Sequence, residues 1–506
     1  MLTASAVLDR AFVVGPVRPR TFGTFVEHLG RCVYQGVYEP THPTADEAGF
    51  RTDVLELVRE LGTSTVRYPG GNFVSGYRWE DGVGPVGQRP ARLDLAWHST
   101  DPNTFGVDEF MAWAKKAGVE PMMAINLGTR GVQEALDLLE YCNVPGGSHF
   151  ADMRRANGAE DPYRIKMWCL GNEMDGPWQI GHKTAHEYGR LAAETARAMR
   201  MIDPDLELVA CGSSNAHMPT FGEWEATVLR EAYEHVDYIS AHAYYYEDDG
   251  DLASFLASAV DMDYFVDSVA ATADYVRAAR KQSKRVHISF DEWNVWYQRR
   301  AESRPPTGDD WPVAPVLLED RYNVADAVVV GNLLISLLRH TDRVHAASLA
   351  QLVNVIAPIM TESSAGTAGR AWRQTTFHPF SLTARHATGE VLQPAVTAPP
   401  VSTARFGDVP AVDLVATREP ETGEAALFVV NRSTTEPVGL EVDVRSLGSA
   451  RLVEALTLSN LDHTWQASAD DATSVLPRPN GTAALADGGL SVELPPVSWT
   501  VVRLAS

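Results

Sequence analysis

The sequence predicts an α/β protein, a (β/α)8 TIM barrel with an all-β sandwich domain at the C-terminus. Three observations predict it. Short apolar runs alternate with helical segments up to about residue 385, and the texture then changes to short strands separated by turn residues. The composition, with 45% hydrophobic residues, is that of a globular protein. Because 506 residues exceed one simple core, we expect two or three folding units.

The first part of the chain contains eight runs rich in Val, Ile and Phe, as expected of barrel strands. They are Phe22–Leu29, Ser64–Tyr68, Glu120–Leu127, Ile165–Gly171, Glu207–Gly212, Asp237–Ala243, Arg285–Trp293 and Val344–Leu352. Between them lie amphipathic segments long enough to be crossover helices. These are Asp46–Leu61, Val132–Cys142, Thr184–Ile202, Glu223–Val236, Ala253–Gln282 and Tyr322–Arg339. The alternation alone also permits an open doubly wound sheet.

The second part of the chain shows the pattern of a β-sandwich, with runs separated by Gly, Pro, Asn and Asp clusters. The runs are Val412–Thr417, Ala425–Asn431, Leu440–Val444, Leu452–Leu458, Leu490–Leu494 and Thr500–Leu504. Residues Leu2–Val17 have a similar texture and could pair with them. We therefore expect a catalytic barrel over 18–385 and a discontinuous sandwich domain made of 1–17 and 386–506.

Charge and cysteine content limit the partners and the compartment. A formal net charge of −23 argues against nucleic acid and anionic membranes, so neutral substrates fit best. The apolar stretch Ala11–Val17 is too short and too interrupted for a signal peptide or membrane span. The four cysteines are widely spaced in apolar contexts, which favours reduced thiols and a cytoplasmic protein.

Two glutamates follow predicted barrel strands four and seven. One ends the segment Gly171-Asn172-Glu173 and the other lies in Asp291-Glu292-Trp293. The active site of such a barrel lies at the carboxyl ends of its strands, and glycoside hydrolysis needs two carboxyls flanking the scissile bond. A single Asn-Glu or Asp-Glu pair is more often a helix cap or a solvated turn. Two such pairs, each beside tryptophan, favour a catalytic site.

Other polar and aromatic residues end the same predicted strands or lie in loops nearby. Taken singly, Arg67 or Glu27 would more often be a structural ion-pair member, and most tryptophans fill cores. Their shared rim favours a role at the site, where an arginine keeps a carboxylate ionised and indole faces stack on sugars. The set comprises Glu27, His28, Arg67, Asn72, His242, Tyr244, Gln351 and Asn354, with Trp97, Trp178, Trp296 and Trp311.

From Phe22 to about Gln351 the chain resembles the intracellular bacterial α-L-arabinofuranosidases of glycoside hydrolase family 51. Four stretches carry the resemblance: RYPGGNFVSGYRWEDGVGP, FGVDEFMAWAKKAGVEPMMAINLGTRG, KMWCLGNEMDGPWQIGH and ISFDEWNVWY. The tail is compatible with that family's C-terminal β-sandwich and contains no diagnostic motif.

The resemblance implies an exo-acting enzyme that releases terminal non-reducing α-L-arabinofuranosyl residues from arabinose-containing oligosaccharides by double displacement with retention. Glu173 of the GNE motif is then the general acid/base and Glu292 of the DEW motif the nucleophile. Two carboxyls about 5 Å apart would fit that mechanism. The resemblance also implies a homo-oligomer, often a hexamer, and a place in L-arabinose metabolism and hemicellulose degradation.

The same resemblance assigns the residues that bind the furanose. Three consecutive tyrosines depart from a simple match, and the spacing from His242 selects Tyr244 among Tyr244–Tyr246. The implied roles are hydroxyl or ring-oxygen binding by Glu27, Asn72, Asn172 and Gln351, contact with the nucleophile by Arg67 and Tyr244, and subsite walls at Trp97 and Trp296.

Two rival functions remain open at this point. The same glutamates could serve a related barrel glycosidase acting on other furanosides or on β-linked glucan or xylan, and a carbohydrate-binding protein without catalysis would need no such pair. No metal or organic cofactor is implied. The run Gly82–Gly87 matches G-x-G-x-x-G without the flanking strand and helix. His182 and His186, spaced as on one helix face, lack the glutamate of a zinc motif.

Overall fold

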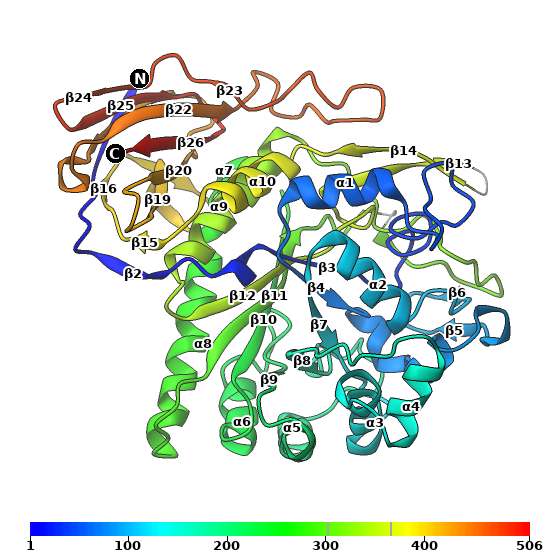
Figure 1. Ribbon diagram of the computed structural model, residues 1–506. Coiled ribbons are helices and arrows are strands. Elements are labelled where there is room, and N and C mark those ends of the chain that lie inside the picture. The colour runs from blue at the N-terminus through cyan, green and yellow to red at the C-terminus, as the bar shows by residue number, and fades with distance from the viewer. Residues whose placement is uncertain (301–302, 365–366) are drawn as a thin grey trace.

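Eight parallel strands close into a barrel, as the sequence predicts, in a computed structural model that describes residues 1–300, 303–364 and 367–506 (Figure 1). The barrel order is β10-β11-β12-β3-β4-β7-β8-β9, which rules out an open doubly wound sheet. Each predicted run contains or overlaps one strand. The strands are β3 Gly23–Phe25, β4 Thr65–Tyr68, β7 Glu120–Ala124, β8 Met167–Leu170, β9 Glu207–Ala210, β10 Tyr238–Tyr245, β11 His287–Val295 and β12 Val344–Leu349.

Helices surround the barrel, and two of the predicted ones differ from the structure. The expected helix Asp46–Leu61 begins at Thr52, because Asp46 Oδ1 instead accepts from the backbone N–H groups of Ala48 and Phe50 in a turn. The expected helix Ala253–Gln282 is divided into α7 and α8. The helices are α1 Thr52–Leu61, α2 Val107–Ala117, α3 Val132–Asn143, α4 His149–Ala156, α5 Ala185–Ile202, α6 Glu223–Ala232, α7 Leu252–Leu256, α8 Ala259–Ala279, α9 Val324–Arg339 and α10 Phe377–His386.

Two further sheets pack face to face beside the barrel, and the N-terminal segment contributes one strand to each. Strand β1 (Leu2–Val7) pairs with β21 (Val438–Asp443), and β2 (Val13–Pro16) pairs with β15 (Glu390–Leu392). The remaining strands are β16 Ala395–Thr397, β24 Ala484–Ala486 and β25 Gly489–Leu494 in the first sheet, and β19 Val412–Arg418, β20 Ala425–Asn431, β22 Arg451–Leu458, β23 Arg478–Pro479 and β26 Ser498–Ala505 in the second.

Three two-stranded ribbons extend from these layers. They are β5 Arg92–Asp94 with β6 Ser99–Asp101, β13 Ile359–Ser364 with β14 Thr367–Arg373, and β17 Pro400–Thr403 with β18 Gly407–Pro410. In the described part of the chain, no helix is both long and apolar enough to cross a membrane.

Helix α9 lies between the barrel and the seven-stranded sheet, and both sides of it are buried (Figure 1). This explains why most of its residues are apolar, with few polar side chains among them. At Gly331 a Cβ atom would lie 2.2 Å from the buried indole of Trp499 on β26, so the close approach of helix and sheet requires glycine there. The two parts of the molecule therefore share a packed interface.

Buried charges connect α9 to the same sheet. Asp413 on β19 accepts hydrogen bonds from Arg432 Nη2 at 2.7 Å and Asn332 Nδ2 at 2.8 Å, and it also pairs with Arg339. Burial alone would raise the pKa of Asp413, but the charges of Arg339 and Arg432 outweigh it and hold that pKa below its usual range. Loss of this carboxylate would leave the buried Arg432 guanidinium without its counter-ion, which is costly.

We expect Asp413→Ala to lower the free energy of unfolding by about 3–5 kcal/mol, the usual cost of breaking a buried ion pair. Urea unfolding followed by circular dichroism measures it. Asp443→Ala is the matched control, because Asp443 pairs with Arg445 on the exposed surface, and it should leave the transition almost unchanged. Equal effects of the two substitutions would show that the buried network does not hold the sheet to α9.

Candidate active site

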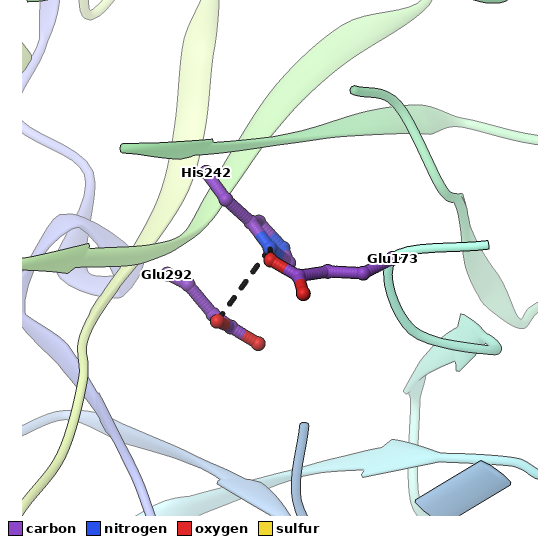
Figure 2. Close-up of side chains that lie close together, drawn as sticks. All are labelled: Glu173, His242 and Glu292. Atoms are coloured by element: carbon purple, nitrogen blue, oxygen red, sulfur yellow. Dashed lines mark hydrogen bonds and ion pairs between the residues drawn. The ribbon is translucent and has the colours of Figure 1, made fainter. Parts of the chain in front are cut away.

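The two predicted catalytic glutamates lie together at the carboxyl end of the barrel. Glu173 follows β8, the fourth barrel strand, and Glu292 lies in β11, the seventh. The backbone reverses sharply at Gly171 (φ 94°) and at Glu173 itself (φ 43°), a conformation that costs a residue with a side chain some free energy. Such strain is typical of functional sites. Figure 2 shows the two carboxylates pointing toward each other, with His242 beside them.

The separation of the carboxylates fits a retaining glycosidase. An oxygen of Glu173 and an oxygen of Glu292 lie within 4.8 Å of each other, and both side chains are buried. Inverting enzymes separate the two carboxyls by roughly 6.5–9.5 Å to admit a water molecule, whereas retaining enzymes keep them about 5 Å apart. The spacing therefore suits direct attack by one of the glutamates.

His242 of β10 bridges the carboxylates. Its Nδ1 lies 3.0 Å from Glu173 Oε1 and 3.5 Å from Glu292 Oε2, and its Nε2 lies 2.9 Å from Asp291 Oδ1. Burial alone would lower the pKa of His242, but the surrounding carboxylates outweigh it and raise the pKa to about 10. The imidazole is thus a buried cation at neutral pH, and both of its nitrogens donate.

Both oxygens of Glu292 accept hydrogen bonds. Arg67 Nη1 donates to Oε1 at 2.7 Å, and the Tyr244 hydroxyl donates to Oε2 at 2.8 Å. Burial and the nearby charge of Glu173 raise the pKa of Glu292, while His242, Arg67 and Tyr244 oppose that rise. The donors also fix the orientation of the carboxylate, which prepares it as a nucleophile.

A second cluster centres on the buried Glu27. Its carboxylate accepts hydrogen bonds from the backbone N–H of Phe73 at 3.0 Å, from Trp97 Nε1 at 2.9 Å and from Gln351 Nε2 at 2.8 Å. Burial raises the pKa of Glu27 to about 7. A Cβ atom at Gly71 would touch both Glu27 and Glu292, so glycine allows the two clusters to share one wall.

Asn172 and Asn72 extend the hydrogen-bond network from Arg67 toward Glu173, which follows Asn172 in the chain. Asn172 Oδ1 accepts from Arg67 Nη2 at 2.7 Å, and Asn172 Nδ2 donates to Asn72 Oδ1 at 3.2 Å. Glu173 Oε2 accepts from Trp178 Nε1 at 2.8 Å. The ten residues to which the resemblance assigns roles thus lie together at one end of the barrel. Of the other polar residues expected there, His28 instead pairs with Asp101, and Asn354 donates to the backbone carbonyl of Arg31.

Some of these residues line a cavity of about 790 Å³, within the range for small-molecule sites. Of the four tryptophans expected at the rim, Trp311 does not line it and instead stacks on His98 with ring centroids 3.7 Å apart. Tyr244 is the tyrosine whose hydroxyl reaches Glu292, although its two neighbours also line the cavity. The lining includes Asn72, Trp97, Glu173, Trp178, Tyr244 and Trp296.

Asp291 is a residue of the site that the sequence reasoning missed. Successive residues of a regular strand point to opposite faces, so Asp291 and Glu292 should not both face the barrel interior. However, the register between β10 and β11 shifts between Ser240 and His242, where β11 contains one residue more than β10. This bulge turns both carboxylates toward His242. The adjacent acidic pair was the available signal.

Comparison with known proteins decides the family. Two models match the chain, "Alpha-L-arabinofuranosidase 1 domain" over residues 57–269 and "Alpha-L-arabinofuranosidase C-terminal domain" over residues 291–498. An intracellular exo-α-(1→5)-L-arabinofuranosidase of Streptomyces lividans is 57% identical over 100% of this chain and 76% of its own length. An exo-α-(1→6)-L-arabinofuranosidase of Bifidobacterium longum is 56% identical over 98% of this chain and 96% of its own.

The chain belongs to the family 51 α-L-arabinofuranosidases. A solved family 51 α-L-arabinofuranosidase of Bifidobacterium longum superposes with a TM-score of 0.95 at 50% identity, covering 99% of both chains. Membership in family 51 confirms the predicted retaining glycoside hydrolase and disfavours the rival activity on β-linked glucan or xylan. It also disfavours a binding protein without catalysis.

In this family 51 member, the histidines set aside above form no joint site. His182 precedes α5, so it does not share a helix face with His186, which instead pairs with Glu231 at 3.2 Å. The metal-compatible group found among the described residues is Glu173, His242 and Glu292.

We expect Tyr244→Phe to move the acid limb of the kcat/KM profile to higher pH. The lost hydrogen bond stabilises the ionised form of Glu292, so its removal raises the pKa of a group that must be deprotonated. The substitution should also lower kcat/KM by about 10- to 100-fold.

Tyr246→Phe is the control for this measurement, because Tyr246 lines the same cavity without a hydrogen bond to either glutamate in the described structure. Its acid limb should remain that of the wild type. An unmoved acid limb in Tyr244→Phe would contradict the account of Glu292.

Proposed function

We propose that the protein releases terminal non-reducing α-L-arabinofuranosyl residues from arabinose-containing oligosaccharides, with Glu292 as nucleophile and Glu173 as general acid/base. The observation that carries the proposal is the pair of buried carboxylates within 4.8 Å of each other at the mouth of the barrel. That spacing supports double displacement through a covalent glycosyl-enzyme, with net retention.

The surroundings of each glutamate support its role in the first step. Glu292 accepts hydrogen bonds from Arg67 and Tyr244, which favour its ionised form against the effect of burial and orient it for attack at the anomeric carbon. Glu173 lines the cavity, where its proton can pass to the glycosidic oxygen as the C–O bond breaks. The electron pair of that bond leaves with the aglycone, and Glu292 forms an ester to the arabinofuranosyl carbon.

In the second step Glu173 is ionised and accepts a proton from water, which attacks the anomeric carbon and expels Glu292. His242 lies beside both carboxylates, whose charges, with that of Asp291, raise its pKa to about 10. The hydrogen bond from His242 to Glu173 stabilises the ionised carboxylate of Glu173 in this step.

The remaining predicted residues supply recognition in this proposal. Glu27, Asn72, Asn172 and Gln351 present oxygen and nitrogen atoms that match sugar hydroxyls, and Gln351 Oε1 is buried without a protein partner in the described structure. Trp97 and Trp296 form apolar walls of the cavity.

A cytoplasmic location and a homo-oligomer, a hexamer by family resemblance, belong to the same proposal. The four cysteines are buried and unpaired, which supports a reducing compartment. Two relatives, from Streptomyces lividans and Halalkalibacterium halodurans, are named intracellular. We place the activity in L-arabinose metabolism and hemicellulose breakdown, with L-arabinose as its product.

The two glutamates should give variants that differ in kind. Glu292→Ala should lose nearly all activity on every substrate, because no other group forms the glycosyl-enzyme ester, and added azide should restore only product of inverted configuration. Glu173→Ala should still be glycosylated by an aryl arabinofuranoside with a good leaving group. Its intermediate should accumulate, and azide should release product of retained configuration.

Nuclear magnetic resonance of the arabinosyl azides determines both configurations. Glu173→Gln and Glu292→Gln are the isosteric control variants. Retained product from Glu292→Ala together with inverted product from Glu173→Ala would reverse the two assignments. A panel of aryl furanosides and pyranosides tests the substrate class, and hydrolysis of the pyranosides alone would overturn it.

A further inference from the structure

The active-site cavity is larger than one sugar requires. Its volume of about 790 Å³ lies toward the upper end of the range for sites that hold drug-sized ligands. Its lining also includes residues that the catalytic mechanism does not use, among them Asp248, Asp261, Arg299 and Arg405. Arg405 comes from the sheet-rich part of the chain, whereas the catalytic groups come from the barrel.

Arg405 is presented by a braced hairpin. It lies in the turn between β17 and β18, and its backbone N–H donates to Ser254 Oγ on α7 at 3.1 Å. Within the turn, Thr403 Oγ1 donates to the carbonyl of Gly407 at 2.9 Å and accepts from the N–H of Phe406 at 2.9 Å. The tip of the hairpin is therefore fixed against the barrel, and the position of Arg405 at the cavity is built into the fold.

The guanidinium of Arg405 has no hydrogen-bond partner among the residues that the structure describes. It lies 5.3 Å from the ring centroid of Phe406, a cation–π contact that orients it without using its N–H groups. Among the described residues it makes no ion pair, whereas Arg299 on the same wall pairs with Asp248 at 2.6 Å. Arg405 lines a cavity large enough for a saccharide, and a guanidinium offers five planar donors that match the hydroxyl groups of a sugar.

We infer that Arg405 forms a binding subsite for the second sugar beyond the scissile bond of an arabino-oligosaccharide. The inference rests on the proposed function, which places the cleaved arabinofuranosyl unit beside Glu27 and the two catalytic glutamates. The first leaving sugar then lies beside Glu173, and the next one reaches Arg405. Chain-length preference would thus be set by the sheet-rich part of the molecule.

The test compares kcat and KM of the wild type and Arg405→Ala on an aryl arabinofuranoside and on arabino-oligosaccharides of two and three units. Loss of the guanidinium hydrogen bonds should lower kcat/KM for the trisaccharide roughly tenfold, mainly through KM. The disaccharide and the aryl substrate do not reach Arg405, so their kcat/KM should change less than about twofold. Arg405→Lys, which keeps the charge and loses the planar fork, should fall between the two enzymes on the trisaccharide.

Arg445→Ala is the matched control, because Arg445 is exposed in the same part of the chain and pairs only with Asp443 among the described residues. It should match the wild type on all three substrates. If Arg405→Ala also matches the wild type, or loses the same factor on every substrate, the subsite is wrong while the proposed function stands. A wild-type enzyme that hydrolyses no arabinofuranoside would overturn the proposed function and this inference with it.

Discussion

The active site depends on a balance of buried charge at the mouth of the barrel. Asp291, Glu292 and Glu173 bring three carboxyl groups together, and the cations His242 and Arg67 compensate them. An uncompensated charge in such a place costs several kcal/mol. Burial alone would raise the pKa of Asp291, but Arg67 and His242 outweigh it and hold that pKa below its usual range. Asp291 in turn supports the imidazolium, which lets Glu173 and Glu292 approach each other closely.

The barrel produces this arrangement because its strand ends converge and because one strand is irregular. Regular alternation along β11 would direct Asp291 away from Glu292, and the bulge against β10 brings both toward His242. The backbone reversal at Glu173 then brings the other carboxylate across the mouth. Catalytic geometry therefore comes from two departures from regular structure, held in place by a close-packed barrel.

Much of this could be predicted from the sequence, and the failures have physical reasons. Short apolar runs alternating with helical segments identified all eight barrel strands, and the strand ends identified Glu173 and Glu292. The start of α1 was misplaced because Asp46 satisfies backbone donors in a turn, an alternative that periodicity cannot reveal. Asp291 was missed because a bulge depends on pairing with a distant strand. Arg405 lies 112 residues after Trp293 in the sequence, and only the tertiary fold places it at the cavity.

The central claim is that Glu292 forms the covalent bond to the sugar, while His242, Arg67 and Tyr244 favour its ionised form against the effect of burial. The most direct measurement is mass spectrometry of peptides from Glu173→Ala, quenched during turnover of an aryl arabinofuranoside, when the intermediate accumulates. The account predicts a pentosyl adduct on the peptide that contains Glu292, with fragmentation placing it on that residue. An adduct on Glu27 or Asp291, or turnover without any adduct and with inverted product, would contradict it.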